Sequence, residues 1–340
     1  MISVGTHRPS GKQRPTLNGM NLESEEDLEP GRYAAIDVGT NSVLLLAADV
    51  SRCGGLRPVL ERAAITRLGE GLGRQPHLQR AAMERTLGTI RDFVRLSRSI
   101  NVHAIAIVGT AVLRDAVNGP DFAQQVMAAT GVPMEIISGA EEAELAFAGN
   151  RGDDRLPKPM GERVIVDIGG GSTEIVRGTV EGTYHRESYR TGAVCLTERY
   201  LASDPPSLAE CEAAQQAIEA ALGTPELLPP RAVLLGTGGT VLNLASMALA
   251  GGMISGPEVH GALLSHGCVA ELLDLLRYMP VEFRRRCPGL EPARADIILA
   301  GAMILHQVMG LLSAPSLTVT ANGIRHGCIY ALARRHFSLR

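Results

Sequence analysis

Two short segments, far apart in the chain, each place an aspartate, glycines and a serine where an apolar run ends. The first reads Ala35-Ile-Asp-Val-Gly-Thr-Asn-Ser42 and the second reads Val166-Asp-Ile-Gly-Gly-Gly-Ser172, so Asp37 and Asp167 occupy matching positions. A glycine-rich turn lets backbone N–H groups point at an anion, because no Cβ blocks close approach. An aspartate at the strand end offers oxygen ligands to Mg²⁺, directly or through water. Each segment therefore predicts half of a clamp for phosphate and magnesium.

A third glycine-rich turn, Gly236-Thr-Gly-Gly-Thr240, follows the apolar run at residues 232–235. One such turn is as often structural as functional, whereas two matched copies and a third turn favour phosphate binding. Hydroxyl and amide side chains on these turns add hydrogen-bond donors to the backbone groups. The predicted phosphate-binding residues on the turns are Asp37, Gly39, Thr40, Asn41, Ser42, Gly169, Gly170, Gly171, Ser172, Thr173, Gly238, Gly239 and Thr240.

The repeated turns lie within an alternation of predicted strands and helices, which is the α/β pattern. In the first part of the chain the apolar patterns predict strands at 33–37, 43–50, 103–108 and 134–137, and helices at 78–100 and 121–130. Ser138-Gly-Ala-Glu141 has the spacing of a capping box and predicts the start of another helix. The second part repeats the scheme, with strands at 164–167, 174–178 and 232–235 and helices at 207–222, after 240 and at 295–312.

Residues 150–161, rich in glycine and proline, form the best boundary between the two parts and a candidate hinge. We predict a mobile tail at 1–30, one α/β domain at 31–155 and a second α/β domain at 156–340. An alternative for the C-terminal helix is that it packs back on the first domain. Gly69-x-Gly71-x-Gly73 lacks the strand–helix context of a dinucleotide fingerprint. We interpret it as part of a turn at the cleft between the domains.

The composition excludes several classes of function. There are 33 Lys and Arg against 36 Asp and Glu, for a net charge of −3, and there are only 5 Phe, 6 Tyr and no Trp. Neither a basic coat nor a base-stacking surface for nucleic acid is predicted. The long apolar runs are interrupted by polar residues, and the first 30 residues hold no apolar signal core. The 6 cysteines form no C-x-x-C pair, so we predict a cytoplasmic protein with reduced thiols that binds no membrane.

The three turns resemble the phosphate-binding loops of the superfamily of actin, sugar kinases and heat-shock chaperones. Within it the chain is most similar to the exopolyphosphatase and guanosine pentaphosphate phosphohydrolase family, over about residues 33–330. This resemblance implies two duplicated actin-like, ribonuclease H-like α/β domains with a phosphate-binding cleft between them, and a homodimer. Four further segments carry it, namely Arg67-Leu-Gly-Glu-Gly-Leu72, Gly109-Thr-Ala-Val-Leu-Arg114, Glu135-Ile-Ile-Ser-Gly-Ala-Glu-Glu142 and residues 164–176.

The resemblance implies a role for each residue that matches a family motif. Glu142 matches the catalytic glutamate and Arg114 the arginine that binds substrate. Asp167 and Glu174 match the acidic residues that hold the metal, which is Mg²⁺ or another divalent cation, with K⁺ as an additional candidate. One segment departs from the family, because Ala321 and His326 stand where acidic residues are usual.

The implied reaction is hydrolysis of a terminal phosphoanhydride, in inorganic polyphosphate or guanosine pentaphosphate, by an in-line water. Glu142 falls in the first turn of a predicted helix, where the helix dipole favours a carboxylate and predicts a lowered pKa. We therefore expect it to aim the water more than to act as a strong base. A long polyphosphate also needs a positive channel, for which the candidates are Arg151, Arg155, Lys158, Arg284, Arg285 and Arg286.

Two other readings share the same phosphate loops. A kinase or ATPase of the superfamily would need an adenosine pocket and an acceptor pocket, and it would bind adenosine without releasing phosphate from polyphosphate. A non-catalytic sensor of a phosphorylated nucleotide would bind tightly without Mg²⁺-dependent turnover, and the changes at Ala321 and His326 fit that reading.

Overall fold

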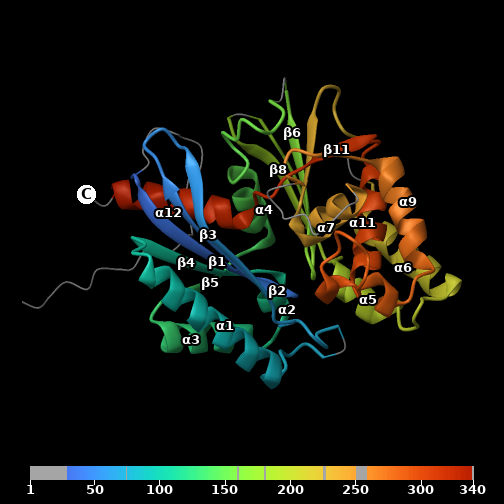
Figure 1. Cartoon of the computed structure of the whole chain (residues 1–340), viewed down its shortest axis with the longest axis horizontal. Coiled ribbons are helices and arrows are strands. Elements are labelled where there is room, and N and C mark those ends of the chain that lie inside the picture. Colours follow the sequence, from blue (N-terminus) through green and yellow to red (C-terminus); the bar gives the residue numbers. More distant parts are fainter. Residues whose placement is uncertain are drawn as a thin grey trace, which may run out of the picture.

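The computed structural model describes residues 29–338, except 74, 159–160, 180, 225–226 and 250–258. The predicted tail at 1–30 therefore lies almost entirely outside the described residues. Within them the chain forms two β-sheets side by side, each flanked by helices (Figure 1). None of the described helices is long and apolar enough to cross a membrane.

The first sheet has the strand order β3-β2-β1-β4-β5. Its strands are β1 (Gly31–Val38), β2 (Ser42–Val50), β3 (Leu56–Ile65), β4 (Ala104–Gly109) and β5 (Met134–Ile136). Strand β2 runs antiparallel to β1 and β3, whereas β4 runs parallel to β1 and β5. The helices of this part are α1 (Arg80–Ser99), α2 (Ala111–Asp115), α3 (Gly119–Thr130) and α4 (Gly139–Ala148). Apolar side chains of α1 and α3, among them Phe93 and Phe122, pack on one face of the sheet.

The second sheet has the order β10-β11-β9-β6-β7-β8. Its strands are β6 (Arg163–Ile168), β7 (Thr173–Gly178), β8 (Thr183–Tyr189), β9 (Val233–Thr237), β10 (Leu263–Ser265) and β11 (Ser316–Val319). The helices are α5 (Ala193–Tyr200), α6 (Leu208–Leu222), α7 (Gly238–Ala248), α9 (His266–Arg277), α10 (Val281–Arg284), α11 (Ile298–Leu311) and α12 (Ile324–Ser338). Helix α11 is almost wholly apolar and buried, as its sequence predicts.

The two sheets repeat one design, and the predicted repeat is confirmed. Strands β1 and β2 form an antiparallel hairpin, as do β6 and β7. The third strand of each part, β3 or β8, lies antiparallel to the second, and the fourth, β4 or β9, lies parallel to the first. In both hairpin turns a glycine N–H donates to a serine carbonyl at 3.0 Å, Gly39 to Ser42 and Gly169 to Ser172. The same local sequence therefore folds into the same turn twice.

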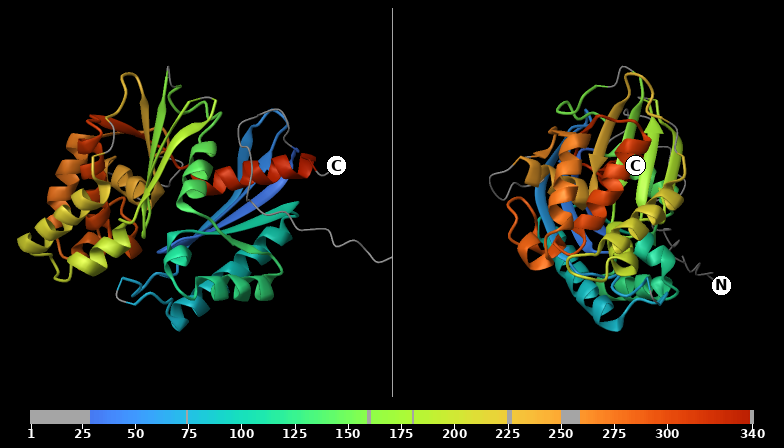
Figure 2. Two further views of the ribbon diagram at one scale, coloured as in Figure 1. Left: turned by 180° about the vertical axis from the view of Figure 1, so that it is seen from behind. Right: turned by 90° about the vertical axis from the view of Figure 1, so that its right-hand side faces the viewer.

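Helix α4 lies between the two parts of the molecule (Figure 1). Its Leu145 belongs to the core of the first sheet, and its Phe147 packs with Ile165 and Val176 of the second. Helix α12, from the end of the described chain, lies against α4, β1 and β2 (Figure 2). Ser138 caps α4 and forms the predicted capping box with Glu141. The helix start, and with it the place of Glu142, is thus determined locally.

Candidate active site

A cavity of about 690 Å³ lies between the two sheets, where β1, β6 and β9 end. It is lined by the predicted residues of all three glycine-rich turns and by the predicted acidic residues Glu142, Asp167 and Glu174. Two predicted site residues, Arg114 and Thr173, are not among the described lining residues. Thr173 is buried and its hydroxyl donates to the carbonyl of Thr191. The topology therefore brings together residues that the sequence spreads over some 200 positions.

The first and second turns touch across the cavity. A Cβ at Gly170 would lie 3.0 Å from Cβ of Thr40, and one at Gly171 would lie 2.7 Å from the Thr40 hydroxyl. The turns come this close only because glycine carries no side chain. A phosphate held by one turn is therefore within reach of the other.

In the third turn, Gly238 has φ +89° and starts helix α7. A Cβ there would lie 2.6 Å from Oδ1 of Asp167 and 2.7 Å from the carbonyl of Ile168. Both the backbone conformation and the crowding require glycine. This contact fixes the third turn against the strand that carries Asp167.

We expect Gly238→Ala to lower the free energy of unfolding by about 1–3 kcal/mol, because alanine is strained at positive φ and would push on Asp167. Urea denaturation followed by circular dichroism measures the change. Gly88→Ala is the matched control, since Gly88 lies inside α1 and a Cβ there would meet no neighbouring atom within 4 Å. That substitution should instead stabilise by about 0.5–1 kcal/mol. Equal effects from both variants would contradict the conclusion that position 238 requires glycine.

Four buried or half-buried carboxylates face the cavity, namely buried Glu142 and Glu174 and half-buried Asp37 and Asp167. Asp167 and Glu174 lie directly opposite each other on β6 and β7. Burial, strengthened by the charge of Glu142, raises the pKa of both Asp37 and Asp167 to about 7. Burial and the charges of Glu142 and Asp167 raise the pKa of Glu174 well above its usual value. So much negative charge in one buried place favours a bound cation.

Glu142 corrects one expectation from the sequence. Its pKa is raised, not lowered, because burial outweighs both the helix start and the neighbouring Arg114 guanidinium. Nη1 of Arg114 donates to Oε2 of Glu142 at 2.6 Å and to the carbonyl of Ile137 at 2.8 Å. The dipole argument is local, whereas the burial comes from the packing of α4 between two sheets. A carboxylate with a raised pKa is a better base near neutral pH.

Three arginines that the sequence did not single out as ligands also line the cavity, namely Arg62, Arg294 and Arg325. The guanidinium of Arg294 lies so close to Gly239 that a Cβ there would overlap it, and its side chain is only 14% exposed. Arg325 is half-buried and donates to the carbonyl of Leu45, and its charge favours the ionised form of Asp37. Both groups face the anion-binding turns and the carboxylates, and each also has an acidic partner, Glu291 for Arg294 and Glu61 for Arg325. No spacing pattern marks Arg294, because it reaches the cavity through tertiary packing.

The predicted positive channel is not formed by the arginine run of residues 284–286. Arg284 is buried and donates to the carbonyls of Leu276 and Ala295, and Arg285 and Arg286 both pair with Glu282. Two further candidates for the channel are paired as well, Arg155 with Asp153 and Lys158 with Asp154. Backbone carbonyls and local ion pairs therefore satisfy these five charges.

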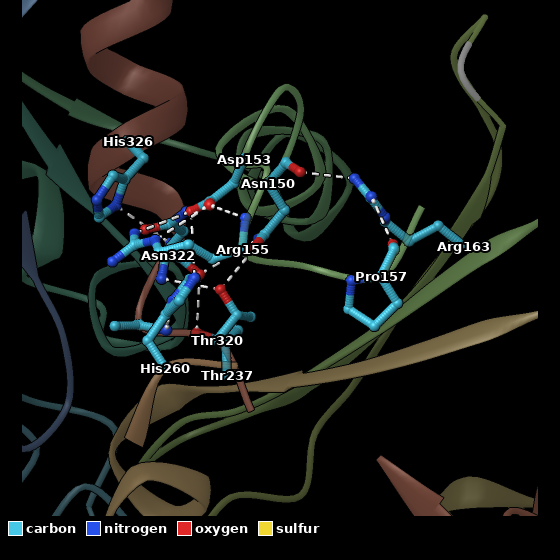
Figure 3. Close-up of polar contacts among 12 residues, drawn as sticks. Asn150, Asp153, Arg155, Pro157, Arg163, Thr237, His260, Thr320, Asn322 and His326 are labelled. Carbon is cyan, nitrogen blue, oxygen red and sulfur yellow. Dashed lines mark hydrogen bonds and ion pairs between the residues drawn. The ribbon is translucent and has the colours of Figure 1, made fainter. Parts of the chain in front are cut away.

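A polar network ties the segment after α4 to the turn before α12 (Figure 3). Asn150 accepts from the Thr320 hydroxyl at 2.6 Å, and Asp153 accepts from the Asn322 amide at 2.8 Å. Nε2 of His260 lies 3.2 Å from Asp153. These bonds hold together strands and turns that come from distant parts of the chain.

The two residues that depart from the family pattern lie in or next to this network. Ala321 lines the cavity, and its backbone N–H donates to Nδ1 of His260 at 3.1 Å. His326 is buried behind the cavity, and burial lowers its pKa to about 3, so it is neutral near pH 7. Of the two changed residues, only Ala321 therefore adjoins the cavity.

The acidic set fits a magnesium ion that shares its ligands with a substrate. Within the described residues, no three His, Cys, Asp or Glu side chains are placed to hold a metal by themselves. Mg²⁺ is usually held by one or two carboxylates and completed by water and phosphate oxygens. Oδ1 of Asp37 is buried without a hydrogen-bond partner among the described groups. Asp37, Asp167 and Glu174 are the residues that would hold such an ion.

Comparison with known proteins relates this site to a family. The model of the Ppx/GppA phosphatase family matches residues 47–336. The chain belongs to that family. It is 34% identical over 318 residues to exopolyphosphatase 2 of Mycobacterium tuberculosis, covering 89% of this chain and 98% of that protein. It is 28% identical over 303 residues to exopolyphosphatase 1 of the same organism, covering 88% and 87%.

Solved structures of Ppx/GppA proteins confirm the predicted fold class. The Aquifex aeolicus family member is 29% identical and matches with a TM-score of 0.75 over 90% of this chain and 99% of that one. An exopolyphosphatase-like protein matches with a TM-score of 0.83 at 28% identity, over 91% and 99%. The chain therefore has the actin-like two-domain α/β fold of this family.

Proposed function

We propose that the protein is a Mg²⁺-dependent phosphohydrolase that releases the terminal phosphate of inorganic polyphosphate. The observation that carries this proposal is the set of four carboxylates, Glu142 among them, that lines one cavity together with three glycine-rich turns. The similarity to mycobacterial exopolyphosphatases supports the substrate class. The turns would bind phosphate oxygens through backbone N–H groups, and Arg294 would add a positive charge beside the third turn.

Glu142 is the proposed base in this reaction. It takes a proton from a water that attacks the terminal phosphorus, the P–O–P bridge to the next phosphate breaks, and inorganic phosphate leaves. Bound Mg²⁺ would neutralise charge on the phosphate oxygens. Arg114 holds the side chain of Glu142 in place by its hydrogen bond and limits the rise in the Glu142 pKa. The paired arginine thus tunes how readily the glutamate accepts the proton.

Guanosine pentaphosphate is the second candidate substrate. The cavity wall includes the apolar side chains of Leu242, Leu290 and Ile297, which are suited to pack on a purine ring. We further propose that the protein acts in the cytoplasm as a homodimer, as the family resemblance implies.

Phosphate release tests the proposal. Purified protein with Mg²⁺ should release phosphate from long-chain polyphosphate, from guanosine pentaphosphate or from both, and EDTA should stop the release. Adenosine binding without release from polyphosphate would instead indicate a kinase or ATPase. Tight binding of either substrate without any turnover would indicate a sensor. Ala321→Asp would then be the first substitution to test for recovery of turnover.

A further inference from the structure

Residues 66–71, which follow β3, form a segment that we call the strap. Its backbone is bound to the first phosphate turn, because the N–H groups of Thr66 and Arg67 donate to the Asn41 carbonyl at 3.1 and 2.9 Å. Gly69 donates to the Thr40 carbonyl at 2.9 Å, and a Cβ on Gly69 would overlap Thr40. The strap and the first turn must therefore move as one piece.

Helix α1 holds the strap from its other side. The guanidinium of Arg85 donates twice to the Thr66 carbonyl, at 3.2 and 3.1 Å, and pairs with Glu70 at 2.9 Å. The strap is thus fixed to the first half of the molecule by backbone and side-chain bonds alike. The sequence predicts that Gly69, Gly71 and Gly73 belong to a turn at the cleft between the domains. None of them is among the described residues that line the cavity, but Gly71 and Gly73 lie beside Glu198 of the second half.

The strap reaches the second half of the molecule at two points. Nη1 of Arg67 lies 2.9 Å from Oδ2 of Asp296, and Nη2 donates to the Ala293 carbonyl at 3.3 Å. The Gly71 N–H donates to Oε1 of Glu198 at 3.0 Å. These are contacts between segments more than 120 positions apart, so they depend on how the two halves are placed.

Each contact point on the second half adjoins another phosphate turn. Ala293 and Asp296 flank Arg294, whose guanidinium lies on Gly239 of the third turn. Glu198 lies on α5, whose first residues, Ala193 and Val194, donate to the carbonyls of Gly169 and Gly170 in the second turn. The strap therefore connects the first turn to the second through Glu198 and to the third through Arg67.

The link through Arg67 is suited to be made and broken repeatedly. The side chain of Arg67 is 44% exposed and that of Asp296 is 31% exposed. Ion pairs this exposed contribute about 0.2–1 kcal/mol and weaken with salt. Arg67 also has φ +52°, a left-handed conformation that is costly for arginine. A long cationic side chain at a strained position points to a use beyond stability.

We propose that Arg67 is a positioning residue that, through Asp296, holds the three phosphate turns in register when the cleft closes on its substrate. The inference rests on the proposed function, because the turns are taken to bind the phosphates. Loss of the link should leave the fold intact and leave the turns free to shift against one another. Misplacement of reacting groups by even 1 Å can lower a rate about 100-fold.

The variant Arg67→Asn tests this, since asparagine tolerates the left-handed conformation and lacks the guanidinium. Arg80→Asn is the matched control, because Arg80 forms an exposed pair with Glu84 at 2.8 Å on α1. We expect Arg67→Asn to speed amide hydrogen exchange in peptides covering the three turns by about two- to fivefold. We expect its kcat on polyphosphate to fall by a similar factor, about two- to fivefold, with little change in KM. Arg80→Asn should change neither.

Two further variants separate positioning from a purely structural effect. Arg67→Lys should recover part of the lost kcat, and the double variant Arg67→Asp with Asp296→Arg should recover more than either single change. Unchanged exchange in Arg67→Asn would overturn the proposal that Arg67 holds the turns in register, whatever the enzymatic activity. Faster exchange with unchanged kcat and KM would overturn the positioning role in catalysis. If wild-type protein releases no phosphate from polyphosphate, the exchange experiment still decides whether Arg67 holds the turns in register, and the proposed function fails separately.

Discussion

Glu142→Gln is expected to lose about 10²- to 10⁴-fold in kcat while still binding polyphosphate, because glutamine keeps the shape of the side chain and cannot accept the proton. The change should be well tolerated by the fold. Glu142 is a buried acid close to other carboxylates, and its neutral form is already favoured by burial. Phosphate release measures the first effect, and equilibrium binding of a fluorescent polyphosphate measures the second.

The neighbouring Glu141 supplies a matched control. It is adjacent in sequence and on the same turn of α4, but its side chain turns back to the backbone and hydroxyl of Ser138 at 2.7 and 2.8 Å. Glutamine also fits a capping box, so Glu141→Gln should keep nearly full turnover. If Glu142→Gln retained turnover within a few-fold of wild type, Glu142 would not be the base.

Asp167→Asn is expected to abolish Mg²⁺-dependent turnover and, at the same time, to stabilise the metal-free protein near pH 7.5. The pKa of Asp167 is raised from 3.8 to about 7 in the folded state. The folded protein therefore binds more protons than the unfolded chain between these values, so the contribution of Asp167 to stability falls as pH rises from about 4 to 7. The loss is up to about 4 kcal/mol, and asparagine, which is always neutral, avoids it.

Denaturant unfolding in EDTA at pH 4.5 and pH 7.5 measures this effect. Buried His326, with a pKa lowered to about 3, makes stability rise with pH between about 3 and 6.5. That effect is common to both proteins and cancels in their difference. Mg²⁺ should raise the midpoint of wild type at pH 7.5 more than that of the variant. Asp121→Asn, at an exposed position, is the control. If Asp167→Asn were less stable than wild type by the same amount at both pH values, the raised pKa of Asp167 would be refuted.

The parts of the site that depend on neighbouring residues in the chain could be predicted from the sequence. The turns after Asp37 and Asp167 fold alike because the hydrogen bond of each lies within the motif itself. The capping box that begins α4 is likewise local, and it correctly placed Glu142 in a first turn. Such features need no knowledge of what packs against them.

The parts that depend on tertiary packing could not be predicted. The predicted direction of the Glu142 pKa shift was wrong, because the sequence of one helix does not show that the helix is buried between two sheets. Arg294 contacts Gly239, which lies 55 positions away in the sequence, and no periodic pattern predicts such a contact. The arginine run at 284–286 is more typical of a solvated face and was only a candidate for contact with a polyanion, whereas Arg284 is buried and donates to the carbonyl of Leu276.

The placement of α4 also bears on how the molecule unfolds. Its Leu145 completes the core of the first sheet and its Phe147 that of the second, so loss of either sheet would strip one face of the helix and expose apolar surface. Helix α12 adds to this, because the chain leaves the second sheet after β11 and returns to the first. Shared elements of this kind couple the stabilities of the parts they join. The two halves should therefore melt together, in one cooperative transition, although each has a sheet and a core of its own.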